Sequence, residues 1–244
     1  MSHEAKDLAP QVRTFATNLS AVLTGVLPGI EGPPLQVLAD RQERHISVRQ
    51  GLGVGLPLKI DGQTMMRLKV SYRCTWNTER EFLSVDECQY QVLPESLTEP
   101  LLRYHYRRKP SGGLPSAHLH VHGHRDEVLA LMVGGKEDRR VKRRLQEIRH
   151  GRFPRLSSLH FPLGGPRFRP GIEDVLDMLR VEIEIDVLPG ANEALRRGRT
   201  VYRQMQLAAA IGDDPLTAAA ELARLGYSVS PAPGDEPRLR NPEF

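Results

Sequence analysis

The sequence has few of the features that stabilise small secreted proteins or anchor membrane proteins. Its 244 residues include two cysteines and only 5% aromatic residues. It contains no run of about 18 consecutive apolar residues. The N-terminal residues lack a basic segment followed by an apolar one, so no secretory signal is expected. We therefore expect a soluble, cytoplasmic protein without a membrane partner, whose core consists mainly of Leu, Val, Ile and Ala.

The two cysteines, Cys74 and Cys88, lie in segments with the alternation typical of β-strands. A hairpin that turns near Glu79 would place Cys74 opposite Ser84 and Cys88 opposite Val70. The two sulfur atoms would then not be cross-strand neighbours, and we predict two reduced, buried thiols. Neither cysteine occupies the electropositive start of a helix that would activate a nucleophile.

Several sequence motifs of nucleotide-binding proteins and hydrolases are also missing. The chain has no GxxxxGK(S/T) loop, no GxGxxG after a strand, no GxSxG turn, no HExxH and no four-cysteine metal pattern. The glycine-rich segment 51–55 lacks the Lys and the following helix of a phosphate-binding loop, so we predict a turn there. These absences leave charge and histidine as the informative residues.

The chain is rich in arginine. Of its 34 basic residues, six are Lys and 28 are Arg, and the net charge is +4. Guanidinium groups suit phosphate and nucleic-acid partners. The codon usage of a GC-rich genome would produce the same excess, so the distribution of charge is more informative than the total.

The pattern of apolar residues divides the chain into a strand-rich first half and a helical second half. The expected strands are 35–38, 45–48, 56–60, 65–76, 82–93, 101–107, 117–124 and 156–163. The expected helices are 4–26, 126–133, 137–150, 172–187, 191–211 and a last one that starts at Asp213-Asp214-Pro215 and ends before Gly226. Asp61-Gly62 supplies the positive φ angles of a type I′ turn between 56–60 and 65–76.

These elements predict an α+β fold. An antiparallel meander packs with helices, and a helical C-terminal part follows. We divide the chain into an α+β domain over 1–188, a C-terminal helical extension over 189–228 and a disordered tail over 229–244. The tail is rich in Pro and polar residues.

One strand carries the main candidate site. His118, His120, His122 and His124 alternate with small or apolar residues, so they share one face of the strand. His118, His120 and His122 could act as catalytic acids and bases near neutral pH. Alternatively, His120 and His122 could bind a divalent transition metal such as Zn²⁺ with a third ligand, for which His105, His160 and several carboxylates are candidates. A third possibility is that the stripe is structural or simply solvated.

The preceding strand, 101–108, would pair with the histidine strand through the loop 109–116. Arg103, His105 and Arg107 lie on one face of it. If that face is also the histidine face, the sheet carries a His/Arg cluster suited to an anionic ligand. The loop length leaves the register, and therefore the choice of face, open.

A basic segment follows the histidine strand. Residues 136–155 hold nine basic and three acidic residues, whereas 170–190 hold six acidic residues and one Arg. Nucleic-acid phosphates would be neutralised by such an array. The alternatives are that the basic and acidic helices pair with each other, or that the basic face is solvated. The candidate phosphate-binding residues are Arg139, Arg140, Lys142, Arg143 and Arg144.

The order of segments around the histidines resembles that of TumE-type toxins of bacterial toxin–antitoxin pairs. The stretches that carry the resemblance are the Tyr-containing strand 102–106, the HxH strand 118–122 and the segment 168–179, FRPGIEDVLDML. The chain departs from those toxins in its length, in the insertion 125–155 and in its added C-terminal helices. The resemblance implies a toxin-like activity for the histidine strand.

We therefore predict a nucleic-acid-directed protein, acting as a toxin-like nuclease through the histidine-lined strand. The sequence establishes no cofactor, and a divalent transition metal is the candidate. The alternative is a non-enzymatic interaction protein of a defence or mobile-element locus. In that case the histidine stripe is incidental and the C-terminal helices bind a protein partner.

Overall fold

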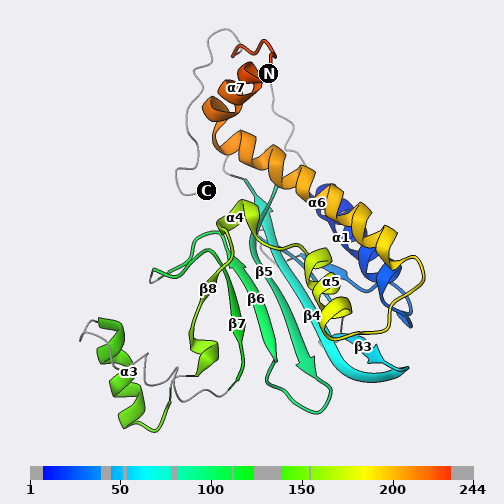
Figure 1. The fold of residues 1–244 in the computed structure, drawn as a ribbon, viewed down its shortest axis with the longest axis vertical. Helices are drawn as coiled ribbons and strands as arrows, with labels where there is room; N and C mark the ends of the chain where they lie inside the picture. Colours follow the sequence, from blue (N-terminus) through cyan, green and yellow to red (C-terminus); the bar gives the residue numbers. More distant parts are fainter. Residues whose placement is uncertain are drawn as a thin grey trace.

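The computed structural model describes residues 8–39, 45–51, 54–77, 82–111, 113–123, 139–153 and 155–231. One antiparallel sheet runs through the molecule in the order β1-β2-β4-β5-β6-β7-β8, and β3 pairs with β4 beside this path (Figure 1). The strands are β1 Gln36–Ala39, β2 Ile46–Arg49, β3 Leu56–Ile60, β4 Gln63–Trp76, β5 Leu83–Pro94, β6 Leu102–Arg107, β7 Ala117–Val121 and β8 Phe161–Pro162.

The helices are α1 Leu8–Val26, α3 Arg139–Arg149, α4 Gly165–Phe168, α5 Ile172–Glu182, α6 Ala191–Asp213 and α7 Pro215–Arg224, with a 3₁₀ turn η1 at Leu156–Ser158. This combination of an antiparallel sheet and helices, with helices at the C-terminal end, confirms the α+β class. None of the described helices is both long and apolar enough to cross a lipid bilayer.

The β3–β4 hairpin forms as its sequence predicts. Asp61 and Gly62 have φ angles of 50° and 77°, and Ile60 pairs with Gln63 across the two-residue turn. The Asp186 carboxylate accepts hydrogen bonds from the backbone N–H groups of Asp61 (3.1 Å) and Gly62 (2.7 Å). The segment after α5 is therefore attached to the tip of this hairpin.

One face of the sheet is covered by helices. In β4 the buried side chains are those of even-numbered residues, and Phe15 of α1 meets Tyr72 edge-on at 5.0 Å between ring centroids. α5 packs its apolar side against the same core, and α6 lies outside α1 and α5 as a further layer (Figure 1). The fully buried aliphatic residues of this core include Val12, Leu23, Val48, Leu68, Val70, Val92, Leu176 and Leu179.

Two predicted elements differ from the structure. The expected strand 156–163 is only the turn η1 and the two-residue strand β8, since Pro162 cannot donate to the ladder and Gly164 has a φ of 77°. The helix expected over 172–187 ends at Glu182, because Glu184 has a φ of 57° and the backbone N–H of Asp186 bonds to Lys59 O at 2.7 Å. The helix expected over 126–133 lies outside the described residues, as does the tail from 232.

The prediction of two free, buried cysteines is confirmed, but their strand partners were wrong. Cys74 pairs with Val85 and Cys88 pairs with Tyr72. A bulge in the β4–β5 ladder between Arg73 and Cys74 shifts the register by one residue.

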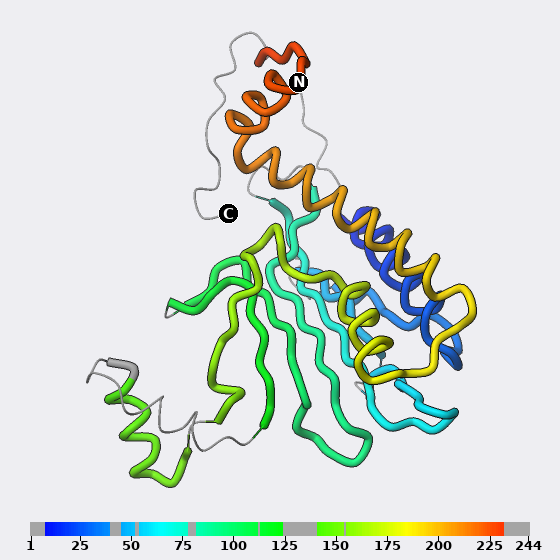
Figure 2. The backbone as a smooth tube through the Cα atoms, viewed as in Figure 1, coloured from blue at the N-terminus to red at the C-terminus, as the bar shows by residue number. Residues whose placement is uncertain are grey.

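The C-terminal helices begin and end where their sequence signals predict. Asp214 accepts a hydrogen bond from the backbone N–H of Thr217 at 3.0 Å, and Gly226 has a φ of 90° after α7. The first turns of α6 bury Ala191 and Leu195 against the core. The end of α6 and all of α7 extend beyond the sheet (Figure 2).

Candidate functional site

The face of the sheet opposite the core helices is polar, and its residues form rows across the strands. Pairing of β4, β5, β6 and β7 aligns Lys69, Gln91, Arg103 and His120 in one row, and Ser71, Gln89, His105 and His118 in the next. A third row contains Arg73, Glu87 and Arg107. We call these residues the polar face. The register resolves the choice left open by the sequence, because Arg103, His105 and Arg107 share the histidine face.

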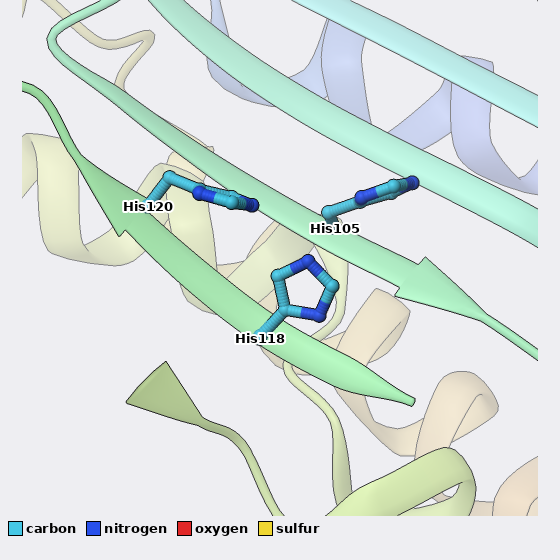
Figure 3. A group of neighbouring side chains, drawn as sticks. All are labelled: His105, His118 and His120. Atoms are coloured by element: carbon cyan, nitrogen blue, oxygen red, sulfur yellow. The ribbon is translucent and has the colours of Figure 1, made fainter. Parts of the chain in front are cut away.

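Three histidines of the polar face come together at its β6–β7 side. Each of His105, His118 and His120 offers one ring nitrogen within 4.8 Å of the others (Figure 3). His118 and His120 are only 2% and 4% exposed. We call these three residues the histidine cluster. Its compactness follows from the pairing of His105 with His118 and from the two-residue spacing within β7.

Hydrogen bonds fix which ring nitrogen of each β7 histidine carries the proton. His118 Nδ1 donates to the Pro115 carbonyl at 2.9 Å, and His120 Nδ1 donates to the Ser157 carbonyl at 2.7 Å. A carbonyl oxygen can only accept, so each Nδ1 is protonated and each neutral ring keeps a lone pair on Nε2. Metal-binding histidines in proteins are oriented by the same kind of bond.

His105 is oriented by a carboxylate. Its Nε2 lies 2.9 Å from Glu87 Oε1, which leaves Nδ1 with the lone pair. Glu87 also contacts Arg107 at 3.2 Å and Arg73 at 3.6 Å. Burial raises the pKa of Glu87, but the hydrogen bonds from His105 and Arg107 outweigh burial and leave the pKa below its usual value. The carboxylate is therefore ionised and holds the imidazole in place.

Burial keeps the histidine cluster neutral. Burial and the nearby charge of Arg103 lower the pKa of His120 to about 4. The hydrogen bond to the Ser157 carbonyl raises this pKa but does not outweigh burial. Burial likewise lowers the pKa values of His118 and His105. At neutral pH the three rings are therefore uncharged, which is the form that binds a metal ion.

A fourth histidine borders the cluster from outside the two strands. The His160 ring lies 4.8 Å from the His118 ring and 4.6 Å from the His120 ring, between centroids. His160 lies between η1 and β8, and β8 pairs with β7. Both histidines that the sequence suggested as a third ligand, His105 and His160, therefore lie at the cluster.

His122 lies just past the end of β7 and makes a different contact. Its Nδ1 lies 3.1 Å from Glu99 Oε1, and the same carboxylate oxygen binds Arg155 at 2.8 Å. Of the predicted trio, His118 and His120 therefore share the cluster with His105, and His122 belongs to this separate ion-pair group. His124 lies outside the described residues.

Arg103 stands beside the cluster with part of its charge unneutralised. It is paired across the strands with His120, and its buried Nε has no hydrogen-bond partner among the residues that the structure describes. Burial lowers its pKa, and the neighbouring Arg107 adds to this effect. A half-buried guanidinium of this kind favours an anionic ligand, because an unpaired buried charge is unfavourable.

The basic helix α3 lies at the β8 side of the molecule (Figure 2). Lys142 and Arg143 are exposed, and Arg144 is half-buried. Arg139 and Arg140 belong to the helix, but their side chains lie outside the described part. The helix therefore presents cations to solvent.

The acidic helix α5 has ion-pair partners other than α3. Asp174 binds Arg199 at 2.9 Å, and Asp177 binds Arg199 at 3.0 Å and Arg180 at 2.7 Å. Within the described ranges, no ion pair joins α3 to α5. Asp174 and Asp177 therefore have their cationic partners in α5 and α6, and the described part of α3 contributes none.

Sequence reasoning missed the residues that orient the cluster. Glu87 would have been identified only from the register of β5 against β6, since it lies 18 positions before His105. The carbonyls of Pro115 and Ser157 carry no sequence signal at all. Comparison with protein-family models, curated proteins and solved structures found no match to the chain.

Proposed function

We propose that this chain is a metal-dependent hydrolase that cleaves phosphodiester bonds of a nucleic acid at the polar face. The observation that carries the proposal is the histidine cluster, in which each ring is oriented by an oxygen acceptor and keeps one lone pair for a common ligand. His105, His118 and His120 hold the metal, and Arg103 binds the phosphate. Under this proposal His122 is not a metal ligand, because it belongs to the ion-pair group with Glu99 and Arg155.

The donor set fits a transition metal such as Zn²⁺. Three neutral imidazoles leave one position of a tetrahedral ion free, as in catalytic zinc sites. Bonds of about 2.1 Å in that geometry separate neighbouring ligand atoms by about 3.4 Å. The nitrogens of the cluster lie within 4.8 Å of one another, so small side-chain rotations bring them to this spacing.

The chemistry expected of such a site is hydrolysis. His105, His118 and His120 would hold the ion, which would supply Lewis-acid chemistry and activate water near neutral pH. Hydrolysis would add one water across the P–O ester bond, with one proton of that water passing to the leaving oxygen. Arg103 and Arg107 lie on the same face, where they can stabilise the charge on the phosphate oxygens.

The choice of a nucleic acid rests on charge. The polar face carries Lys69, Arg73, Arg103 and Arg107, with Glu87 among them, and α3 exposes further cations. Basic side chains that are spread over the polar face and α3 match the repeated phosphates of a polynucleotide. The resemblance of the strands 102–106 and 118–122 to TumE-type toxins supports a toxin-like nuclease.

A second candidate function is binding of a protein partner without catalysis. Large apolar side chains of α6, α7 and the residues after them are exposed, namely Leu207, Ile211, Leu216, Leu222, Leu225 and Tyr227. Such a cluster is typical of an interaction surface. Under this proposal the histidines only stabilise the edge of the sheet.

Hydrolysis of labelled single-stranded and double-stranded RNA and DNA, with and without Zn²⁺ or Mn²⁺, tests the first function. We expect cleavage that chelation abolishes, that His120→Ala removes and that His150→Ala leaves unchanged, since His150 is exposed on α3's C-terminal side. Folding of each variant is checked by circular dichroism. Metal-independent cleavage, or equal cleavage by His120→Ala, would exclude the proposal. A partner captured by the intact chain and lost on truncation after Met205 would favour the second function.

A further inference from the structure

A cavity lies on the other side of the molecule, between α1, α5 and α6. Its volume is about 260 Å³. The walls are mostly apolar and include Phe15, Leu19, Val22, Ile172, Val201 and Met205. The helices α1 and α6 lie side by side along it (Figure 1). The histidine cluster plays no part in this cavity, because the sheet separates the two.

A carboxyl group lines this apolar cavity. Glu173, the second residue of α5, is only 4% exposed. Within the described ranges, the Glu173 side chain makes no ion pair. The backbone N–H of Glu173 is a hydrogen-bond donor to the carboxyl group. Burial raises the pKa of Glu173, and the negative charge of Asp174 raises it further. The backbone N–H and Arg199 lower this pKa, but they do not outweigh burial. A buried carboxylate that forms no direct ion pair is unfavourable, and a cationic ligand would compensate its charge.

Two glycines make room for this carboxyl group. A Cβ atom at Gly171 would lie 2.5 Å from Glu173 Oε2, and one at Gly198 would lie 2.8 Å from Glu173 Oε1. Gly198 lies inside α6, where glycine is less favourable than alanine by about 1 kcal/mol. The dipole of α5 also favours a carboxylate in its first turn, but that interaction does not require two neighbouring glycines.

The neighbouring hydroxyl groups already have partners. Tyr72 and Tyr90 share a hydrogen bond of 2.5 Å between their hydroxyl oxygens, and the Tyr202 hydroxyl donates to the Arg169 carbonyl at 3.0 Å. Asn18 and Arg197 line the cavity from exposed positions at its rim. The Glu173 carboxyl is therefore the buried acidic group of the lining, and no ion pair neutralises it within the described ranges.

We propose that this cavity binds a small organic amine, with the ammonium group on the Glu173 carboxylate and an apolar body between α1 and α6. An ammonium group supplies both the missing charge and the hydrogen-bond donors that an ionised carboxylate accepts. A cavity of about 150 Å³ accommodates benzene, so the volume here suits an aromatic ring with a short alkyl chain.

Calorimetric titration of the full chain with three matched probes tests the proposal. The probes are 4-phenylbutylamine, 4-phenylbutanol and 4-phenylbutanoate, which differ in the charge of the end group. We expect the amine to bind at least about tenfold more tightly than the alcohol, and the acid to bind most weakly. Glu173→Gln keeps the shape of the side chain and should reduce the preference for the amine over the alcohol to less than about threefold.

Two controls make the result decisive. Ala21→Trp, at an exposed position on the lining, should weaken binding of all three probes, whereas His120→Ala should change none. Equal affinity for amine and alcohol in the wild type, tighter binding of the acid, or no binding of the amine by folded protein at millimolar concentration would each overturn the proposal. So would an unchanged amine preference in folded Glu173→Gln.

Discussion

The two faces of the central sheet show how one set of strands can pack a core on one side and align polar side chains on the other. In β4 and β5, Tyr72, Cys88 and Tyr90 point into the core beneath α1 and α5. The residues between them, such as Ser71 and Gln89, belong to the polar face, and the same alternation in β6 and β7 places the histidine cluster there. The helix-covered face therefore stabilises the fold, and the polar face is free to hold reactive side chains.

The largest expected effect contrasts the stability contributed by the two faces. Leu176→Ala removes a fully buried side chain of α5 and should lower the free energy of unfolding by about 2–5 kcal/mol. Lys69→Ala on the polar face should change it by no more than about 0.5 kcal/mol. Urea denaturation of both variants gives the comparison. Similar losses for the two would show that the polar face is as structural as the core.

Two glycines of α6 test the close packing beneath the helices. A Cβ at Gly198 would lie 2.5 Å from Val22 Cγ2, whereas a Cβ at Gly212 would meet nothing within 4 Å. Gly198→Ala should therefore destabilise the protein by about 1–3 kcal/mol, despite the better helix propensity of alanine. Gly212→Ala should stabilise it by up to about 1 kcal/mol. Thermal unfolding distinguishes the two, and stabilisation by Gly198→Ala would contradict this packing.

Arg103 of the polar face and Arg67, which lies two residues before Lys69 in β4, differ in their partners. Arg67 binds Glu95 at 2.6 Å, whereas the buried Nε of Arg103 has no partner in the described part of the chain. Arg103→Ala should weaken nucleic-acid binding by about tenfold and reduce the dependence of affinity on salt by about one ion. Arg67→Ala should have a smaller effect. Fluorescence anisotropy over a series of salt concentrations measures the affinity of both variants. Equal effects of the two substitutions would show that Arg103 does not bind the phosphate.

The smallest expected effect concerns the pH dependence of the helix-covered face. Burial raises the pKa of Glu173 above its value in the unfolded chain. Between these two pKa values the native state binds more protons than the unfolded state, so the stability contributed by Glu173 falls as the pH rises through this window. Glu173→Gln should therefore be more stable than the wild type at neutral pH, with a difference that shrinks below about pH 4.5. A constant difference across the pH range would contradict the burial of an ionisable group.

The elements with strong local signals were predictable from the sequence. Alternation identified β4 and its buried face, and Asp61-Gly62 identified the hairpin turn. Asp214 and Gly226 marked the two ends of α7. In each case the signal lies within a few residues of the structure that it specifies, so no long-range information is needed.

The candidate site depended on long-range register and was only partly predictable. His118 and His120 could be assigned to one face, but their pairing with His105 follows from the β6–β7 register across the 109–116 loop. The bond from Arg107 N to Ser116 O, at 2.7 Å, closes that loop. The burial of Glu173 could likewise not be predicted from the sequence, because it depends on the proximity of Gly198, which is 25 positions away.

The metal content of the purified, untagged protein decides whether the histidine cluster is a metal site. After loading with Zn²⁺ and extensive dialysis, mass spectrometry should find about one ion per chain in the wild type and in the His150→Ala control. His120→Ala, which removes one imidazole of the histidine cluster, should retain far less metal. A wild-type protein that retains no ion, or a His120→Ala variant that retains as much as the wild type, would contradict a metal site on the polar face.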